Sequence, residues 1–324
     1  MTAKRLAQFL AGVIAAAAIA HLLVAAAAAW TIYSLYPHRI FNVRSWADAG
    51  NERFHLVGTF LRETTRNRSV PVIAFAGSSV AYGYPWHERF VFSRLFADRH
   101  ATRRVINASI IAADITGVND FTICGAWRNR LKLDALIIEL PVVNTTSYLT
   151  NLRKAGQATV ASGACAPGPE DIGYLELVST RTRGIGWIPF LWNRTSGETK
   201  EIAFQAAAVP AGYFTSRVDF ESVRPDFVGR IMAALTNARQ VATSVYAFPS
   251  PVFLGGLAEI GEDTAAVKEQ LRTALAACAA LDTVRCVDPS SLYFERGYYQ
   301  NLTHLNQAGH RALAALLDAQ VVAN

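Results

Sequence analysis

Val70-Pro-Val-Ile-Ala-Phe-Ala-Gly-Ser-Ser79 is the stretch that decides the fold, because a continuous apolar run, ended by Gly77, leads directly into two serines. An unbroken apolar run of this length, stopped by glycine, is typical of a parallel strand buried on both faces. We therefore predict a strand over 70–76, a turn at Gly77 and a helix entered at the serines.

Further short apolar runs alternate with helix patterns along the rest of the chain. The predicted helices are 54–66, 88–98, 114–131, 225–239, 264–281 and 306–321, and the further strands are 104–107, 134–140, 244–248 and 284–287. Asn306 is a suitable N-cap for the last helix. This alternation predicts an α/β fold of three layers (α/β/α), in which a mostly parallel five-stranded sheet lies between helices. Residues 145–224 break the rhythm and are interpreted as an insertion.

Composition excludes several classes of protein. With 324 residues, 52% of them hydrophobic, the chain is long enough to bury a sizeable core, which excludes disorder. The formal net charge is +6, of which Lys4 and Arg5 contribute two, leaving +4 on the remainder without any Lys/Arg run. Nucleic acid is therefore not an expected partner.

An apolar segment without Asp, Glu, Lys or Arg extends over residues 6–38. About 20 apolar residues suffice to span the hydrocarbon core of a membrane. Lys4 and Arg5 precede the segment and Trp30, Tyr33 and Tyr36 lie near its far end, as expected for a membrane helix with its N-terminus in the cytoplasm. We predict a cytoplasmic stub and a single transmembrane anchor over 1–38 in the inner (cytoplasmic) membrane. Residues 39–324 would form a periplasmic or extracellular domain.

A cleaved signal peptide is the alternative to the anchor, since the alanine run that ends at Ala29 offers small-residue cleavage sites. The apolar region of a signal peptide has roughly 7–15 residues, about half the length found here, which favours the anchor. His21 lies inside the segment and is interpreted as a neutral, hydrogen-bonded imidazole.

The four cysteines are Cys124, Cys165, Cys278 and Cys286, and their spacing matches no zinc pattern. An exported chain would carry them where disulfides form. Three pairings are possible. We favour Cys278–Cys286 because it is local, which leaves Cys124–Cys165. We expect neither a metal ion nor a cofactor.

Two residues, one near each end of the predicted domain in sequence, indicate a catalytic nucleophile and its base. In an open α/β sheet, ligands bind outside the carboxyl ends of the strands, and Ser79 follows the first of these ends. His304 lies in the loop just before the last predicted helix. A hydroxyl needs a neighbouring base to attack an acyl carbon at neutral pH, and imidazole is the usual one.

The serine block, Gly77-Ser78-Ser79, together with Asn301-Leu-Thr-His304 before the last helix, resembles the SGNH (GDSL-type) hydrolase superfamily. The resemblance covers residues 70–145 and 243–320. It implies a flavodoxin-like sheet, with Ser79 as nucleophile and His304 as base.

The same resemblance implies an oxyanion hole. Its donors would be the N–H groups of Ser79 and Ser109 and the side chain of Asn144. Loss of one such donor costs about 10²–10³ in rate.

Asn301 departs from the family pattern, because it occupies the position of the catalytic acid. An amide cannot balance the charge of an imidazolium. Three alternatives remain: a Ser79–His304 dyad oriented by a carbonyl or amide, an acid supplied by Asp288 or Glu295, and a site that only binds.

Aromatic residues follow the nucleophile closely, and Tyr82, Tyr84 and Trp86 are candidates for a platform on which sugar rings stack. His310 is interpreted as a structural residue in the first turn of the last helix.

The resemblance implies a membrane-anchored, extracytoplasmic serine esterase or O-acyltransferase, acting on acetyl or other acyl groups of a cell-surface polysaccharide or another acylated glycan. A multi-pass membrane acyltransferase is a possible partner. The alternative is a catalytically silent protein of the same fold that binds glycan or that acyltransferase. Neither the polymer nor the choice between hydrolysis and transfer follows from the sequence.

Overall fold

The computed structural model describes residues 3–30, 56–65, 70–84, 86, 88–110, 113–142, 164–165 and 226–321. The predicted insertion at 145–224 lies outside the described residues apart from Ala164 and Cys165, and so do Asn144 and residues 31–38 of the predicted anchor.

A five-stranded parallel sheet forms the centre of the fold. Its strands are β1 (Val72–Ala76), β2 (Arg104–Asn107), β3 (Leu133–Leu140), β4 (Ala242–Pro249) and β5 (Val284–Cys286). The spatial order is β2-β1-β3-β4-β5, and every neighbouring pair is parallel. This is the predicted sheet with the flavodoxin-like order, in which the topological switch point lies between β1 and β3.

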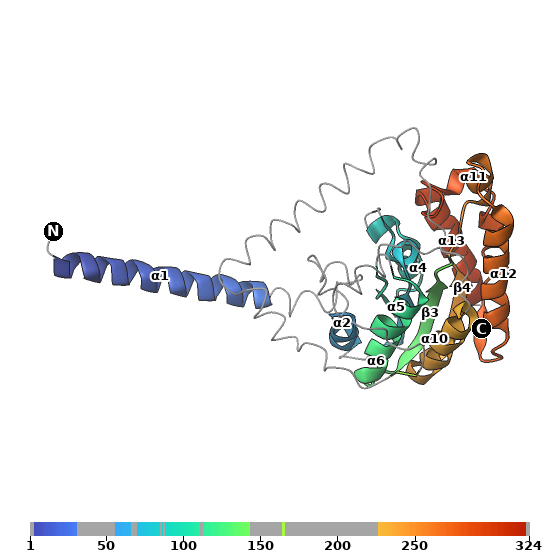
Figure 1. The fold of residues 1–324 in the computed structure, drawn as a ribbon. Helices are drawn as coiled ribbons and strands as arrows, with labels where there is room; N and C mark the ends of the chain where they lie inside the picture. The colour runs from blue at the N-terminus through green and yellow to red at the C-terminus, as the bar shows by residue number, and fades with distance from the viewer. Residues whose placement is uncertain are drawn as a thin grey trace.

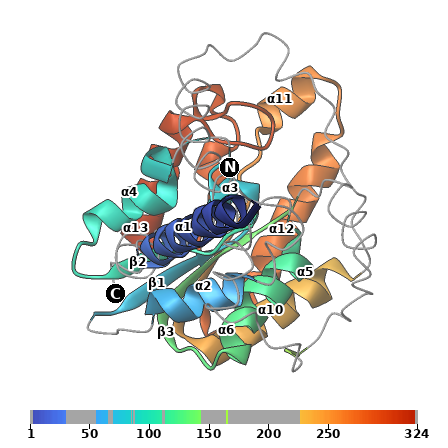
Figure 2. The same ribbon diagram turned by 90° about the vertical axis from the view of Figure 1, so that its left-hand side faces the viewer.

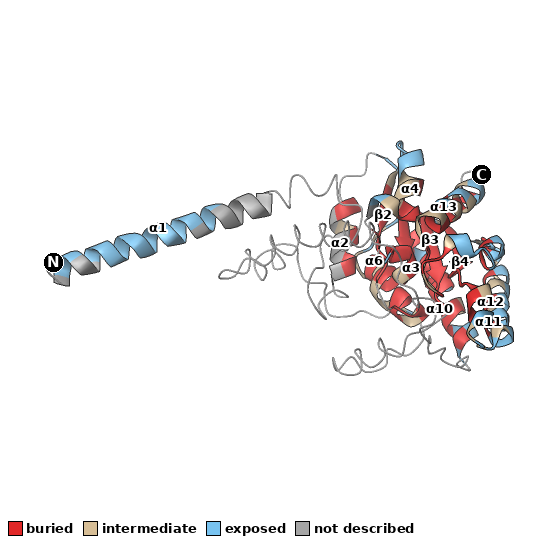
Figure 3. Cartoon of the chain, turned by 90° about the horizontal axis from the view of Figure 1, so that it is seen from above, coloured by how far each residue is buried: buried red, intermediate tan, exposed pale blue. Residues whose placement is uncertain are grey.

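Helices pack on both sides of this sheet (Figures 1 and 2). The α-helices of the domain are α2 (Leu56–Thr65), α3 (Ser79–Tyr82), α4 (Phe92–Arg99), α5 (Ile115–Gly117), α6 (Cys124–Arg128), α10 (Phe227–Val241), α11 (Leu254–Glu259), α12 (Thr264–Ala279) and α13 (Gln307–Val321). Shorter turns are the 3₁₀ segments η4 (Glu88–Phe90), η6 (Ser290–Leu292) and η7 (Arg296–Tyr298), and the π-helical η5 (Val118–Ile123). Helices α4 and α13 pack together on one side, whereas α6, α10 and α12 lie on the other, as the view in Figure 3 shows.

The core extends through the sheet: β1 is buried along its whole length, and most residues of β3 and β4 are buried (Figure 3). On the side covered by α4, Phe75 meets Phe92 and Phe96 edge-on at centroid distances of 5.5 and 5.6 Å. Phe92 also meets Phe248 of β4 at 5.9 Å. Edge-to-face aromatic pairs of this kind add about 0.5–1.5 kcal/mol each beyond the area they bury. They fix α4, and with it the loop after Ser79, on the sheet.

Two segments differ from the prediction. The helix predicted over 114–131 is divided into α5, η5 and α6, since Asp114 caps the first turn through Gly117 N–H at 2.8 Å and a π-helical stretch follows. Helix α11 was not predicted, because its Gly255-Gly256 pair lowers helix propensity; the space there admits no side chain, since a Cβ at Gly256 would lie 2.4 Å from the Phe253 ring.

Asn306 caps the last helix as predicted, accepting the N–H of Gly309 at 3.0 Å.

Helix α1 (Ala3–Trp30) covers most of the predicted anchor and carries exposed apolar side chains. Within the part of the chain that the structure describes, no helix qualifies as a membrane span by length and apolar character. The anchor and the location of the domain therefore stay predictions.

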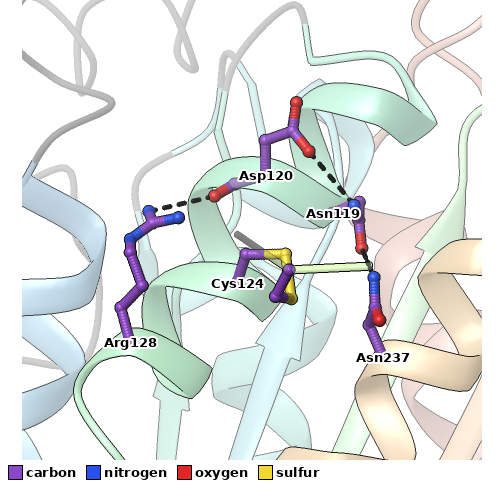
Figure 4. Close-up of a disulfide and its surroundings, with 6 residues drawn as sticks. Asn119, Asp120, Cys124, Arg128 and Asn237 are labelled. Carbon is purple, nitrogen blue, oxygen red and sulfur yellow. Dashed lines mark hydrogen bonds between the residues drawn. A yellow bond between two sulfur atoms is a disulfide. The ribbon is translucent and has the colours of Figure 1, made fainter. Parts of the chain in front are cut away.

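Both favoured disulfides form, Cys124–Cys165 and Cys278–Cys286. Figure 4 shows the first of them at the junction of η5 and α6. Beside it, Asn237 of α10 donates to Asn119 at 3.0 Å, and Asn119 donates to Asp120 at 3.1 Å. The disulfide therefore links Cys165, within the predicted insertion, to α6, which packs on α10.

Candidate active site

The turn after β1 presents Ser79 at the carboxyl edge of the sheet. β1 ends at Ala76, Gly77 and Ser78 form the turn, and Ser79 begins α3. Gly77 is required by space, since a Cβ there would lie 2.6 Å from both Cβ and Oε2 of Glu139. Ser79 is only partly buried, so its hydroxyl is accessible at this edge.

His304 meets Ser79 from the other end of the chain. Its Nε2 lies 2.9 Å from Ser79 Oγ across 225 residues of sequence. This is the contact that a nucleophile and its general base must make. The structure thus brings together the two residues that the sequence assigned as nucleophile and base.

The opposite nitrogen of the imidazole faces Asn301. His304 Nδ1 lies 3.0 Å from Asn301 Oδ1. The same oxygen accepts the backbone N–H groups of His304, at 2.8 Å, and Thr303, at 3.0 Å. Two N–H donors can only be met by the carbonyl end of the amide, so its orientation is fixed.

This orientation determines the tautomer of His304. The amide oxygen that faces Nδ1 can only accept a hydrogen bond, so Nδ1 carries the hydrogen and Nε2 is left as the acceptor for the hydroxyl of Ser79. The contact with Thr303 Oγ1, 3.2 Å from Nδ1, is compatible with this assignment. Asn301 therefore selects the productive tautomer without supplying a charge.

Neither proposed substitute acid reaches the imidazole. Asp288 accepts the N–H of Ser290 at 2.9 Å, and Glu295 accepts the N–H of Gly297 at 3.3 Å; both carboxylates are exposed. Among the described residues, no carboxylate bonds to His304. The geometry excludes Asp288 and Glu295 as the acid and corresponds to a Ser79–His304 pair oriented by an amide.

Desolvation of the imidazole lowers the pKa of His304 to about 4. Burial removes water from the imidazole and so disfavours its charged form, and no carboxylate among the described residues bonds to it to offset this effect. The base is therefore neutral at physiological pH and able to accept a proton.

The oxyanion donors are placed only in part. The N–H of Ser79 makes no hydrogen bond within the described part of the chain and is available at the edge of the site. The assignment of Ser109 is wrong, because its N–H donates to Asn107 Oδ1 at 3.0 Å and the residue is fully buried. Asn144 lies outside the described residues.

The aromatic platform is corrected too. Tyr82 and Trp86 are buried and cannot stack on a substrate. Trp86 instead donates its indole N–H to Leu305 O at 2.8 Å. Tyr84 remains available: it is 42% exposed, and its ring lies 5.5 Å from that of His304 in an edge-to-face arrangement.

Two buried polar residues that support the turn were not identified from the sequence. Asn107, at the end of β2, donates to Ala81 O at 2.7 Å and Ser93 Oγ at 2.9 Å. Glu139, near the end of β3, accepts the N–H of Ser78 and of Ala81, each at 2.8 Å. The signal for Glu139 is a single carboxylate in the otherwise apolar run Leu136-Ile-Ile-Glu-Leu140.

His310 packs inside the domain near the first turn of α13. Its Nδ1 accepts the N–H of Phe92 at 3.4 Å and its ring stacks on that of Phe92, as a structural residue would. In the described ranges no group of three or more His, Cys, Asp or Glu side chains is arranged to hold a metal ion.

No protein-family model matches the sequence, and no curated protein does. Solved structures do. One is a member of the lipolytic G-D-S-L family from Veillonella parvula, 10% identical with a TM-score of 0.43, matched over 77% of this chain and 96% of that one. An inhibitor-bound aryl esterase from M. smegmatis is 13% identical with a TM-score of 0.39, over 78% and 99%.

An acetylxylan esterase from Geobacillus stearothermophilus is 10% identical with a TM-score of 0.42, over 78% of this chain and 94% of that one. These likenesses are remote. The chemistry assigned to the chain comes from its own residues.

Proposed function

We propose that the protein is a serine esterase or O-acyltransferase that works through Ser79 and His304. One observation carries the proposal: Ser79 Oγ lies 2.9 Å from His304 Nε2, while Asn301 Oδ1 lies 3.0 Å from Nδ1. An accessible hydroxyl, a neutral base and an oriented tautomer are what acyl transfer requires.

The reaction follows from these positions. Ser79 Oγ attacks the acyl carbonyl carbon and its proton passes to His304 Nε2. The oxyanion of the tetrahedral intermediate accepts the N–H of Ser79, and Asn144 is the proposed side-chain donor. When the ester C–O bond breaks, the imidazolium returns the proton to the leaving oxygen. Water or a sugar hydroxyl then attacks the acyl-serine, again with His304 as base.

The location is proposed to be extracytoplasmic, with residues 39–324 held by an anchor in the inner membrane. The support is the charge-free stretch 6–38 after Lys4 and Arg5, together with four cysteines paired in two disulfides, since disulfides persist in oxidising compartments.

The proposed substrate is an O-acylated cell-surface polysaccharide. Tyr84, exposed beside His304, offers a ring face of the kind that sugars stack on. A multi-pass membrane acyltransferase is the proposed donor of acyl groups if the enzyme transfers them.

A second function is favoured by one residue. Asn301 supplies no charge to His304, and in a serine protease the change of the orienting aspartate to asparagine costs about 10⁴ in turnover. A catalytically silent protein that binds glycan or a membrane partner would tolerate this loss.

Labelling of the full-length protein with a serine-directed fluorophosphonate separates the two functions. The enzyme is expected to label stoichiometrically, and Ser79→Ala is expected to abolish labelling. Ser290→Ala, which removes an exposed serine elsewhere, is the matched control and should label as wild type does. Absence of labelling in folded wild type would contradict catalysis and leave the binding function.

A further inference from the structure

Glu139 is fully buried near the end of β3, directly beneath the turn that carries Ser79. The catalytic steps described above do not use it. Burying a carboxyl group costs free energy unless hydrogen bonds replace its water. A carboxyl in the middle of an apolar strand therefore calls for partners, and Glu139 has four.

The two oxygens of Glu139 serve different groups. Oε2 accepts the backbone N–H of Ser78 and of Ala81, each at 2.8 Å. Oε1 accepts the hydroxyls of Ser78, at 2.5 Å, and of Ser250, which follows β4. Both carboxyl oxygens are thus hydrogen-bonded, and the donors come from the turn after β1, from α3 and from the residue that follows β4.

The two amides held by Oε2 bracket the nucleophile. Ser78 lies immediately before Ser79, and Ala81 lies two residues after it. With both N–H groups bonded to one buried oxygen, the backbone on either side of Ser79 is held in the position from which Ser79 Oγ reaches His304 Nε2 at 2.9 Å. The close approach of Glu139 also accounts for Gly77, where a Cβ would lie 2.6 Å from Oε2.

We propose that Glu139 is a positioning residue, whose Oε2 fixes the turn at residues 77–81 and thereby holds Ser79 in line with His304 and the substrate carbonyl. The inference rests on the proposed function. Burial raises the pKa of Glu139, but Oε2 accepts both N–H groups whether or not Oε1 is protonated. What matters is an acceptor at this place, not a charge.

Two variants separate the role of the hydrogen-bond acceptor from that of the charge. Glu139→Gln keeps the shape and can direct its carbonyl oxygen at the two amides, whereas Glu139→Leu removes the acceptor. Asp134→Asn is the matched control, because Asp134 also lies on β3 and accepts a backbone N–H, that of Val72 at 2.6 Å, but at the opposite end of the strand. Displacement of a reacting group by about 1 Å can cost 10²-fold in rate.

The rate of fluorophosphonate labelling is expected to fall at least about 100-fold in Glu139→Leu and less than about tenfold in Glu139→Gln. Asp134→Asn should stay within about twofold of wild type. With an aryl acetate, kcat should fall in Glu139→Leu while KM changes little, because Glu139 does not touch the substrate. A folded Glu139→Leu that labels like wild type would overturn the proposal, and so would a Glu139→Gln no better than Glu139→Leu.

Amide hydrogen exchange in wild type tests the positioning role independently of activity, and it does not require Glu139→Leu to fold. The N–H groups of Ser78 and Ala81 should exchange at least about tenfold more slowly than that of Ser79, which has no partner among the described residues. Equal exchange would overturn the positioning role. If wild type does not label, the proposed function fails, and slow exchange would still show that Glu139 fixes the turn.

Discussion

The indole N–H of Trp86 donates to the carbonyl oxygen of Leu305 at 2.8 Å, across 219 residues of sequence. Trp86 belongs to the loop after Ser79, and Leu305 follows His304 directly. The bond therefore joins the segment that carries the nucleophile to the segment that carries the base. Because both side chains are buried, the link is shielded from competing water.

Trp86→Phe should keep the aromatic packing and remove this bond. We expect a loss of about 1–3 kcal/mol of stability, since Leu305 O would be left buried and unpaired, and labelling at Ser79 slowed by about tenfold. Thermal unfolding and labelling kinetics measure the two effects. Trp127→Phe, a similar change in α6 at a half-buried position, is the control and should leave labelling unaltered. Unchanged labelling in Trp86→Phe would show that the loops are aligned without the bond.

Much of the fold follows from local sequence patterns. The five strands are short apolar runs and the helices have regular patterns, so both could be predicted with boundaries shifted by a few residues. The pair of Ser79 and His304 could be assigned because each follows a recognisable block. These features are set by residues close together in the sequence, so they can be recognised without a structure.

The details of the site depend on contacts that exist only in the folded protein. The tautomer of His304 is set by the direction of the Asn301 amide, and this is fixed by backbone N–H groups whose positions exist only once the turn has folded. Aromatic residue type alone could not show that Trp86 is buried and Tyr84 exposed. For Ser109 a signal was present: asparagine commonly bonds the backbone two residues on, and Asn107 does so here.

The Cys278–Cys286 bridge joins α12 to β5, and its replacement by two serines is expected to destabilise the domain. The chain-entropy model gives about 2.5 kcal/mol for a loop of this size, equivalent to a fall in Tm of roughly 5–10 °C. Scanning calorimetry under non-reducing conditions measures the change. Mass mapping of wild type without reductant should find no free thiol, and an alkylated Cys278 or Cys286 would contradict the pairing.

The topology proposal makes a separate prediction for reporters fused after Asn324. An alkaline phosphatase fusion, which needs an oxidising compartment, should be active, whereas a fluorescent reporter that matures only in the cytoplasm should be dark. Replacing both Lys4 and Arg5 with glutamate should reduce export, because those charges are what keep the N-terminus inside. A fluorescent fusion at the C-terminus would place the domain in the cytoplasm.

The pH profile of the enzyme should report the lowered pKa of His304, about 4. Catalysis needs the neutral imidazole, which is present above this pKa and lost as the pH falls through it. We therefore expect kcat/KM for an aryl acetate to be level from about pH 5.5 to 8 and to fall by about tenfold per pH unit below 4. A limb centred near 6.5, the ordinary pKa of histidine, would indicate that the imidazole is not desolvated in solution.

Asn301→Asp should increase turnover and move this acid limb. A carboxylate at 3.0 Å from Nδ1 would keep the tautomer that Asn301 selects, and would add the charge that stabilises the imidazolium formed when Ser79 loses its proton. The pKa of His304 should rise, since an opposite charge favours the protonated form, so the limb should shift to higher pH. On the plateau we expect kcat for an aryl acetate to rise at least about tenfold, or ~1.4 kcal/mol of barrier.

Asn306→Asp is the matched control for this change. It introduces the same charge into the same loop and keeps the oxygen that accepts the N–H of Gly309, but it loses the Nδ2 donor to the carbonyls of Gly297 and Tyr299. Asn306 makes no hydrogen bond to the imidazole among the described residues. Its kcat and its acid limb should remain close to those of wild type. If Asn301→Asp left both unchanged, the imidazolium would gain nothing from the new charge and the amide-oriented dyad would already be complete. If neither wild type nor Asn301→Asp turned over ester with the fold intact, the binding function would replace the enzymatic one.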